Sequence, residues 1–192
     1  VEESENGEFK PGDHVIVTSY DLGMNTSGGF GQYIRVPAGW VVPMPDGLAA
    51  RDSMIYGTAG FTAALSILQL IEHGVTPEKG QVLVSGATGG VGGIAVSILS
   101  KIGYSTVAVY RKESDTDYLK EIGASSLINS AELTKENKRP LLKAVYAGCV
   151  DAVGGEVLEA AIKSVLPAGT VTCCGNAASP NLSLTVYPFI LR

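Results

Sequence analysis

Residues 81–112 read QVLVSGATGGVGGIAVSILSKIGYSTVAVYRK, and this stretch decides the fold. It begins with a short apolar run, Val82 to Val84, and continues through a glycine-rich turn, residues 85–93, into a helical pattern that reaches Ile102. A second apolar run follows from Val107 to Tyr110. An apolar strand that leads through glycines into an amphipathic helix is typical of the phosphate-binding βαβ unit, in which backbone N–H groups at the helix N-terminus bind a pyrophosphate.

The helix after the glycines carries an unbroken apolar stripe, because its apolar residues recur at offsets of three and four. They are Val91, Ile94, Ala95, Ile98, Leu99 and Ile102. Gly103 then provides the residue type that commonly ends a helix. A glycine-rich turn can also occur without a ligand, but strand, stripe and returning strand together favour a dinucleotide site.

The end of the second strand predicts which dinucleotide binds. An NAD site places Asp or Glu about 20 residues after the last glycine of the turn, whereas an NADP site places a basic residue near the 2′-phosphate. Tyr110, Arg111 and Lys112 occupy this position, so the charges favour NADP(H). Glu113 follows directly and would neutralise Lys112 in part. The alternative is that both cations are ordinary solvated loop residues.

The composition is that of an ordinary globular protein: 192 residues, 45% apolar and 17% charged, with 24 glycines that suit many tight turns. A net charge of −5 argues against nucleic acid or an anionic membrane as the main partner. No apolar run is expected to approach the roughly 20 residues of a membrane-spanning helix. Cys149, Cys173 and Cys174 lack zinc-ligand spacing, so we expect no metal and a cytoplasmic location.

Residues 1–50 differ from the rest of the chain in their pattern of β-type runs and turns. Two β-type runs, His14 to Thr18 and Gln32 to Val36, and a short strand around Val41 are separated by turns rich in Gly, Pro and Asn. So few strands cannot close a sheet by themselves. We therefore expect residues 1–50 to be the incomplete end of a β domain and residues 51–192 to form a second domain.

From Ala50 onward, predicted helices and strands alternate. The first helix is expected from Ala50 to about His73. After the βαβ unit, the predicted helices cover 116–122, 141–146 and 156–166, and the predicted strands cover 126–128, 149–153 and 170–174. This alternation predicts an α/β fold with a doubly wound parallel sheet, whose ligands bind at the carboxyl ends of the strands.

Four stretches resemble a known family: Tyr56 to Ala64, Ser85 to Gly93, Asp151 to Gly155 and Tyr187 to Arg192. Together they are similar to the medium-chain dehydrogenase/reductase superfamily, in its zinc-independent NADPH quinone oxidoreductase branch, and most closely to the acrylyl-CoA reductase group. The resemblance implies a GroES-like catalytic β domain followed by a Rossmann domain of strand order 3-2-1-4-5-6. Residues 1–50 would then be the remnant of the GroES-like domain, and residues 51–192 an NADP-binding Rossmann domain that lacks its sixth strand.

The resemblance also implies positions that bind the cofactor. These are Thr88, Gly89, Gly90 and Val91 for the pyrophosphate, Lys112 for the 2′-phosphate, Val153 and Gly154 for the nicotinamide ribose, Cys174, Gly175 and Asn176 for the nicotinamide, and Phe189 and Arg192 for the closing edge of the cleft. Tyr110 and Arg111 replace a small hydroxyl residue and a glycine that are usual in the family. We therefore expect a phosphate pocket of the same charge but of different shape.

The implied reaction is hydride transfer from NADPH to an activated C=C bond, as in an acrylyl-CoA-like enoyl thioester, or to a quinone. An enoyl thioester also needs a proton donor, for which Tyr20 is a weak candidate, although an ordinary tyrosine at the rim of the site is the stronger alternative. By the resemblance, Tyr56 and Thr58 would face the nicotinamide, and they are weak catalytic candidates as well. Packing at a domain boundary is an equal alternative for Tyr56 and Thr58. We expect a small-molecule substrate and a homodimer.

The alternative function is a non-catalytic NADPH-binding module or redox sensor. For this fragment we expect NADPH binding with little or no turnover. Without a sixth strand, the strand at 170–174 would be an open edge of the sheet. We expect that edge to be paired with another chain or covered by residues 181–192.

Overall fold

The computed structural model describes residues 1–192, which form two compact units, Val1–Thr58 and Ala59–Arg192. The boundary between the units falls within helix α1 (Ala50–Glu72), after Thr58, whereas the predicted domain boundary lies between residues 50 and 51. The GroES-like origin of residues 1–50 stays a prediction.

The first unit contains little regular structure. β1 (Val15–Val17) pairs antiparallel with β2 (Val41–Pro43), and the short 3-10 helix η1 (Ala38–Trp40) leads into β2. The predicted strand at 32–36 is wrong, since these residues form no strand. A β-type run becomes a strand only when a partner strand accepts and donates its backbone hydrogen bonds. None of residues 1–58 is buried, so this unit has no second layer on which a further strand could pack.

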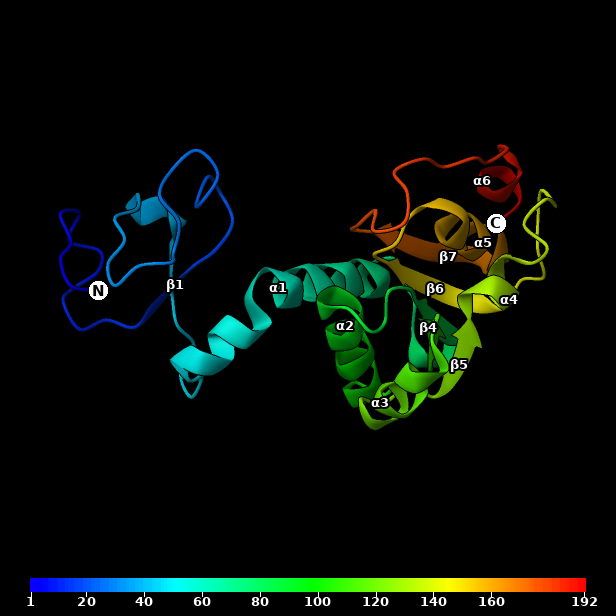
Figure 1. Ribbon diagram of the computed structural model, residues 1–192, viewed down its shortest axis with the longest axis horizontal. Helices are drawn as coiled ribbons and strands as arrows, with labels where there is room; N and C mark the ends of the chain where they lie inside the picture. The colour runs from blue at the N-terminus through cyan, green and yellow to red at the C-terminus, as the bar shows by residue number, and fades with distance from the viewer. The chain divides into compact units, whose positions relative to one another are not determined.

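The second unit is a five-stranded parallel sheet in the order β5-β4-β3-β6-β7, with helices on both faces (Figure 1). Its strands are β3 (Gln81–Val84), β4 (Thr106–Tyr110), β5 (Ser126–Asn129), β6 (Tyr146–Asp151) and β7 (Val165–Cys173). In chain order this is 3-2-1-4-5, the order of a doubly wound sheet. The predicted fold class is therefore confirmed.

The remaining helices of this unit are short. They are α2 (Gly90–Lys101), α3 (Thr116–Glu121), α4 (Ser130–Thr134), α5 (Gly155–Ser164) and α6 (Tyr187–Leu191), with 3-10 turns η2 (Pro77–Lys79) and η3 (Glu113–Asp115).

The sheet has an apolar core on each face because successive side chains of a strand point to opposite sides. Val82 and Val84 of β3 pack with side chains of α1, α2 and α3, whereas Leu83 between them packs with side chains of α4 and α5. This division matches the helices on the two sides of the sheet in Figure 1. The two layers fix the strands, and thereby the loops at their carboxyl ends.

The predicted helix at 141–146 is wrong, and a helix occurs earlier, at α4. The Asn129 side chain caps α4 by accepting a hydrogen bond from the backbone N–H of Ala131 at 3.0 Å. Leu142 and Val145 instead donate their backbone N–H groups to the carbonyls of Lys163 and Ser164, at 3.0 and 2.8 Å. These long-range bonds hold 141–145 outside any helix, and β6 begins at the next residue.

Helix α1 is long and apolar enough to cross a membrane by length and composition alone, which corrects the expectation that no apolar stretch approaches that length. Its helical geometry is interrupted at Gly57, with φ 47° and ψ −149°. The residues that it buries all follow this break, and Ala63, Ile67 and Leu70 belong to the core of the second unit. The continuous part, 58–72, is shorter than the roughly 20 residues that a spanning helix needs.

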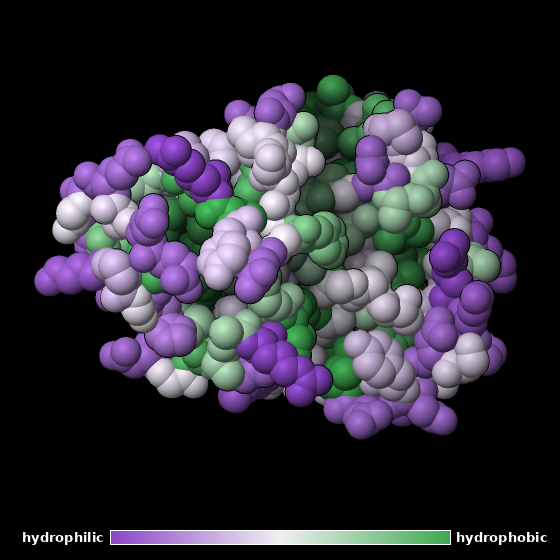
Figure 2. All heavy atoms as spheres, turned by 60° about the vertical axis from the view of Figure 1, so that its left-hand side comes forward, coloured by the Kyte–Doolittle hydropathy of each residue, from purple (hydrophilic) through white to green (hydrophobic).

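The same helix also has an exposed apolar side. Phe61, Leu65, Leu68 and Ile71 recur at offsets of three and four and are 44–52% exposed. Figure 2 shows apolar side chains among the polar ones on one face of the molecule. The high hydropathy of α1 thus reflects one side packed in the core and a second side at the surface.

Strand β7 is an edge of the sheet, as predicted, but residues 181–192 do not pair with it as a strand. The backbone N–H of Ser183 binds Glu159 Oε1 on α5 at 2.8 Å, and α6 follows. Arg192 forms a hydrogen bond to β7, in which its guanidinium group donates to the carbonyl oxygen of Val165. That this edge is covered by residues 181–192 or paired with another chain therefore stays a prediction.

Candidate functional site

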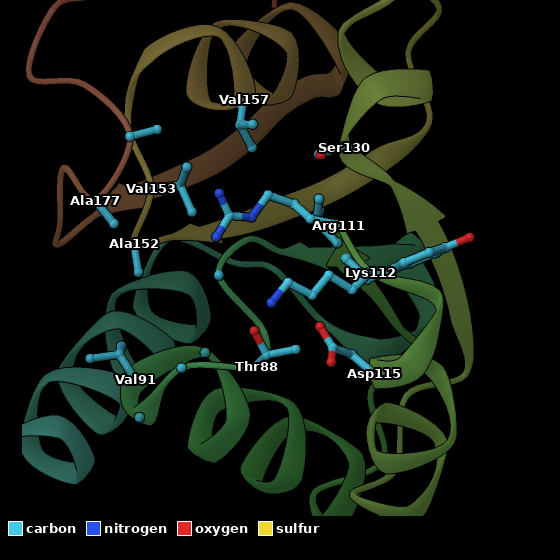
Figure 3. Close-up of a pocket in the computed structure, with 17 residues that line it drawn as sticks. Thr88, Val91, Arg111, Lys112, Asp115, Ser130, Ala152, Val153, Val157 and Ala177 are labelled. Carbon is cyan, nitrogen blue, oxygen red and sulfur yellow. The ribbon is translucent and has the colours of Figure 1, made fainter.

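A pocket of about 480 Å³ opens at the carboxyl ends of β3, β4 and β6 (Figure 3). The turn after β3, the residues that end β4, and the loop after β6 supply most of its lining. The lining residues are Gly86, Thr88, Gly89, Gly90, Val91, Gly92, Val109, Tyr110, Arg111, Lys112, Asp115, Ser130, Ala152, Val153, Val157, Ala177 and Ala178. A doubly wound sheet binds its ligands at this end.

The glycines of the turn bring helix α2 against the end of β3. A Cβ atom on Gly92 would lie 2.2 Å from the carbonyl oxygen of Gly86, so no side chain fits there. Gly86 has a φ of 59° and accepts a hydrogen bond from the backbone N–H of Gly89 at 2.8 Å. The turn is therefore tight, and its backbone is open to a ligand on the pocket side.

The N-terminus of α2 faces this pocket without a side-chain cap. Gly89 is the N-cap residue, and no side chain accepts from the first N–H groups of the helix. Gly89, Gly90 and Val91 all line the pocket. Because the first N–H groups of an α-helix have no partner inside the helix and carry a partial positive charge, this end of α2 is suited to an anion.

Two cations extend into the pocket from the end of β4. Figure 3 shows the side chains of Arg111 and Lys112 directed toward its centre, with Lys112 above Thr88. Neither cation forms a salt bridge with a carboxylate of the chain. The Glu113 carboxylate instead accepts a hydrogen bond from Tyr110 Oη at 3.1 Å, and this bond raises the pKa of Tyr110. Glu113 therefore forms no salt bridge with Lys112, and its partial neutralisation of that charge stays a prediction.

The acid that does line the pocket is Asp115. The turn η3 returns the chain to the pocket, and the backbone N–H of Asp115 donates to the carbonyl oxygen of Lys112 at 3.1 Å. In Figure 3 the Asp115 carboxylate lies near Thr88 and Lys112. The pocket therefore contains two positive side chains and one negative side chain, an excess of positive charge that suits a phosphorylated ligand.

A family profile described as "Zinc-binding dehydrogenase" matches residues 90–192, more than half of the chain. The chain belongs to this family. Within the medium-chain dehydrogenase/reductase superfamily it falls in the quinone oxidoreductase branch, as its motifs predict. It is 47% identical over 189 residues to the putative quinone oxidoreductase YhfP of Bacillus subtilis, and 43% identical over 192 residues to the acrylyl-CoA reductase AcuI of Ruegeria pomeroyi.

Solved structures of related proteins match the whole length of this family member. The yhdH oxidoreductase of Salmonella enterica, in complex with NADP, is 42% identical with a TM-score of 0.96. The yhfP protein of Bacillus subtilis, with NAD bound, is 46% identical with a TM-score of 0.97. Each match covers 100% of this chain and 58% of the other. Similarly, the match to YhfP covers 98% of this chain and 57% of the relative, and the match to AcuI covers 100% and 58%. The chain thus spans less than two thirds of these relatives.

In this zinc-binding dehydrogenase family member, the pocket brings together most of the predicted cofactor-binding residues. They are Thr88, Gly89, Gly90, Val91, Tyr110, Arg111, Lys112 and Val153. Gly154, Gly175 and Asn176 lie behind this lining, since Cβ atoms on the two glycines would meet backbone atoms of Asn176 and Ala152 within 3.3 Å. The sulfur of Cys174 donates to the carbonyl oxygen of Asp151 at 3.2 Å and does not line the pocket.

Two predicted residues lie away from this pocket. Phe189 on α6 is 69% exposed and does not line the pocket. Arg192 donates its guanidinium N–H groups to the carbonyls of Val165 and Leu142, which precede or begin strands at the opposite end of the sheet. The structure therefore does not bring Arg192 to the pocket, because the backbone carbonyls of the chain itself bind its charge.

Sequence reasoning missed several lining residues of this pocket. Ser130 directly follows β5, so the rule that ligands bind at carboxyl ends of strands would have found it. Asp115 depends on the η3 turn, and Ala177 and Ala178 depend on a loop that folds back over β6. No motif in the sequence signals those three residues.

The candidate catalytic residues all belong to the first unit. Tyr20 has a φ of 53°, and its ring stacks on Trp40 with centroids 5.3 Å apart. Thr58 Oγ1 lies 3.1 Å from Thr18 Oγ1, and Tyr56 is 53% exposed. Their catalytic roles stay predictions.

Two of the three thiols are held in the protonated form by burial. Burial raises the pKa of Cys149 well above its usual range, and burial also raises the pKa of Cys174. A raised pKa keeps a thiol protonated and unreactive at neutral pH. No group of three or more His, Cys, Asp and Glu side chains is arranged to hold a metal ion.

Proposed function

We propose that this chain is the NADP(H)-binding part of a zinc-independent, NADPH-dependent reductase of the medium-chain type. The observation that carries the proposal is that the uncapped N-terminus of α2 and the side chains of Arg111 and Lys112 share one pocket. Backbone N–H groups at a helix N-terminus suit a diphosphate, and a guanidinium or ammonium group suits the additional 2′-phosphate.

The residues present fit this cofactor. The turn between β3 and α2 leaves no room for a side chain at Gly92, and no side chain caps the helix end. Related oxidoreductases crystallised with NADP or NADPH support the assignment, whereas yhfP was crystallised with NAD. We therefore expect the charges at 111, 112 and 115 to set the preference between the two dinucleotides in this chain.

When bound, NADPH would supply a hydride from C4 of its nicotinamide. The proposed acceptor is an activated C=C bond of an acrylyl-CoA-like enoyl thioester, or a quinone, in line with the names of the relatives. The residues of this chain would bind the diphosphate and the 2′-phosphate and thereby orient the dinucleotide. Tyr20 remains the candidate for the proton donor that an enoyl thioester requires, and Tyr56 and Thr58 remain candidates for residues that face the nicotinamide. A homodimer in the cytoplasm is part of the same proposal.

A non-catalytic NADPH-binding module or redox sensor is the second candidate function. It is favoured by the chemistry of the pocket lining, in which Asp115 is the sole carboxylate and no histidine or cysteine occurs. Hydride acceptance by a quinone or an enoyl thioester separates the two functions. Steady-state reduction of acrylyl-CoA or a quinone by the full-length parent supports a reductase, and NADPH binding without any turnover supports a sensor.

Titration of the 192-residue chain with NADPH and NADH tests the cofactor assignment. We expect the wild type to bind NADPH at least about tenfold more tightly, since a charge-assisted bond to a phosphate contributes about 1.5–3 kcal/mol. Arg111→Ala and Lys112→Ala should reduce this ratio and leave NADH affinity nearly unchanged. Equal affinity of the wild type for both dinucleotides would contradict the assignment, and robust turnover by this chain alone would contradict its description as a binding fragment.

A further inference from the structure

Two polar side chains lie fully buried between the central strands and do not line the pocket. Ser85 follows β3 and Asp151 ends β6, and each residue is 0% exposed. Ser85 Oγ donates a hydrogen bond to Asp151 Oδ1 at 2.5 Å. Val84 and Val150 already pair the two strands in register, so the side-chain bond is not needed to join them. A buried carboxylate is strongly destabilising unless hydrogen-bond donors surround it, so the donors around Asp151 must offset the cost of its burial.

The pair binds three consecutive backbone N–H groups in the segment after β6. Ser85 Oγ accepts from Ala152 N at 3.0 Å, and Asp151 Oδ2 accepts from Val153 N at 3.3 Å and from Gly154 N at 2.8 Å. Gly154 has a φ of 71°, so the chain turns sharply where these bonds end. The carboxylate of Asp151 and the hydroxyl of Ser85 therefore fix the backbone conformation of residues 152–154.

Segment 152–154 in turn holds a second segment. The carbonyl oxygen of Val153 accepts from Ala178 N at 2.9 Å, and Gly154 forms an isolated parallel bridge with Ser179. Residues 152, 153, 177 and 178 all line the pocket. We call residues 152–154 and 177–178 the β6 wall of the pocket. Its position depends, through an unbroken series of hydrogen bonds, on Asp151 and Ser85.

The β6 wall and the segment that carries the two cations follow strands on opposite sides of β3. β3 is central, with β4 as one neighbour and β6 as the other. Figure 3 shows Ala152, Val153 and Ala177 across the pocket from Lys112 and Asp115. If the diphosphate binds at the turn and the 2′-phosphate at the cations, the remainder of the dinucleotide, its nicotinamide half, extends toward the β6 wall.

We propose that Asp151, together with Ser85, is a positioning residue that sets the affinity for the nicotinamide half of NADP(H). It does so by holding the β6 wall in place, without touching the dinucleotide. The inference rests on the proposed function, because it requires that NADP(H) occupies the pocket.

The test compares two ligands by isothermal titration of the 192-residue chain. NADPH contains both halves of the dinucleotide, whereas adenosine 2′,5′-bisphosphate contains the adenosine 2′-phosphate half alone. For Asp151→Ala we expect NADPH affinity to fall by about tenfold or more, because several buried N–H groups lose their acceptors. Affinity for adenosine 2′,5′-bisphosphate should change by less than about twofold, since distant sites without shared partners act independently.

Two further variants separate positioning from loss of fold. Asp151→Asn retains one oxygen that can accept from Gly154 N, so it should recover part of the NADPH affinity. Ser85→Ala retains the bonds from Asp151 to Val153 and Gly154, so its loss should lie between wild type and Asp151→Ala. The matched control is Thr106→Val, which alters a buried hydroxyl at the amino end of β4 and should leave both affinities unchanged.

The outcomes separate this inference from the proposed function. A loss confined to NADPH supports the inference, whereas an equal loss for both ligands, or no loss in any variant, overturns it. If circular dichroism shows that Asp151→Ala is unfolded, Asp151→Asn and Ser85→Ala replace it in the test. A loss confined to NADPH in these variants supports the inference, and an equal loss for both ligands overturns it. If the folded wild type binds neither ligand, the proposed function itself fails.

Discussion

Asp115 and Lys112 belong to one pocket and are joined by a hydrogen bond of 3.1 Å from the backbone N–H of Asp115 to the carbonyl oxygen of Lys112. This bond belongs to the turn that returns the chain to the pocket after β4. It places a carboxylate beside the cations that we assign to the 2′-phosphate. A 2′-phosphate at the end of β4 would consequently be attracted by Arg111 and Lys112 and repelled by Asp115.

Asp115→Asn should therefore increase the preference for NADPH over NADH. Removal of one negative charge from the pocket should raise the ratio of the two affinities by about three- to tenfold at low salt, because the repulsion acts on the 2′-phosphate. Titration with both dinucleotides measures the ratio. Asp117→Asn is the matched control, since its side chain is 97% exposed on α3 and outside the pocket. An unchanged ratio in Asp115→Asn would show that its carboxylate does not act on the phosphate.

Gly92→Ala should disrupt the packing of α2 on the turn. The new Cβ atom would lie 2.2 Å from the carbonyl oxygen of Gly86, which is backbone and cannot move aside. We expect the free energy of unfolding to fall by about 2–3 kcal/mol or more, measured by urea denaturation. Gly103→Ala is the comparison, because a Cβ there meets no atom within 4 Å and only its φ of 90° is unfavourable. A smaller loss at Gly92 than at Gly103 would contradict the geometry of the turn.

Thr106→Val should stabilise the protein. Thr106 is fully buried at the start of β4, and its Oγ1 atom has no hydrogen-bond partner. A methyl group of similar size removes the unfavourable burial of that hydroxyl, so the free energy of unfolding should rise by about 1 kcal/mol. Urea denaturation of both proteins provides the measurement. Destabilisation instead would mean that the hydroxyl has a partner, such as a buried water.

Stability should fall as the pH rises above about 10, the ordinary pKa of tyrosine. Burial raises the pKa of Tyr104 and of Tyr146 above that of the unfolded chain. A group with a raised pKa binds its proton more tightly in the folded state, so its contribution is complete below the unfolded pKa and is lost as pH rises through the folded pKa. The relevant range is about pH 9 to 11, roughly one unit on either side of the ordinary tyrosine pKa. Over this range, Tyr146→Phe should make the loss of unfolding free energy less steep. Tyr33→Phe, at a 69% exposed tyrosine, is the control, and an equal change in both variants would refute the role of burial.

The βαβ unit could be predicted because its signals are local. The apolar residues of 82–84 and 107–110 and the stripe of α2 depend on their own spacing, and the structure places them in β3, β4 and α2. Arg111 and Lys112 could be predicted for the same reason, since they directly follow β4.

The wrong predictions depend on contacts that are distant in the sequence. Residues 141–145 have a helical pattern, but Lys163 and Ser164 accept their backbone hydrogen bonds instead. Residues 32–36 have a strand pattern without a partner strand. Likewise, Asp115 and Ala178 line the pocket because the chain folds back on itself. A return of this kind produces no regular spacing of residues that can be recognised in the sequence.

A crystal structure of this chain soaked with NADPH tests the central claim most directly. The account predicts the diphosphate against the backbone N–H groups of Gly90 and Val91, and the 2′-phosphate against Arg111 and Lys112. A turn that remains empty at saturating NADPH, or that is occupied by a side chain of the protein itself, would contradict it.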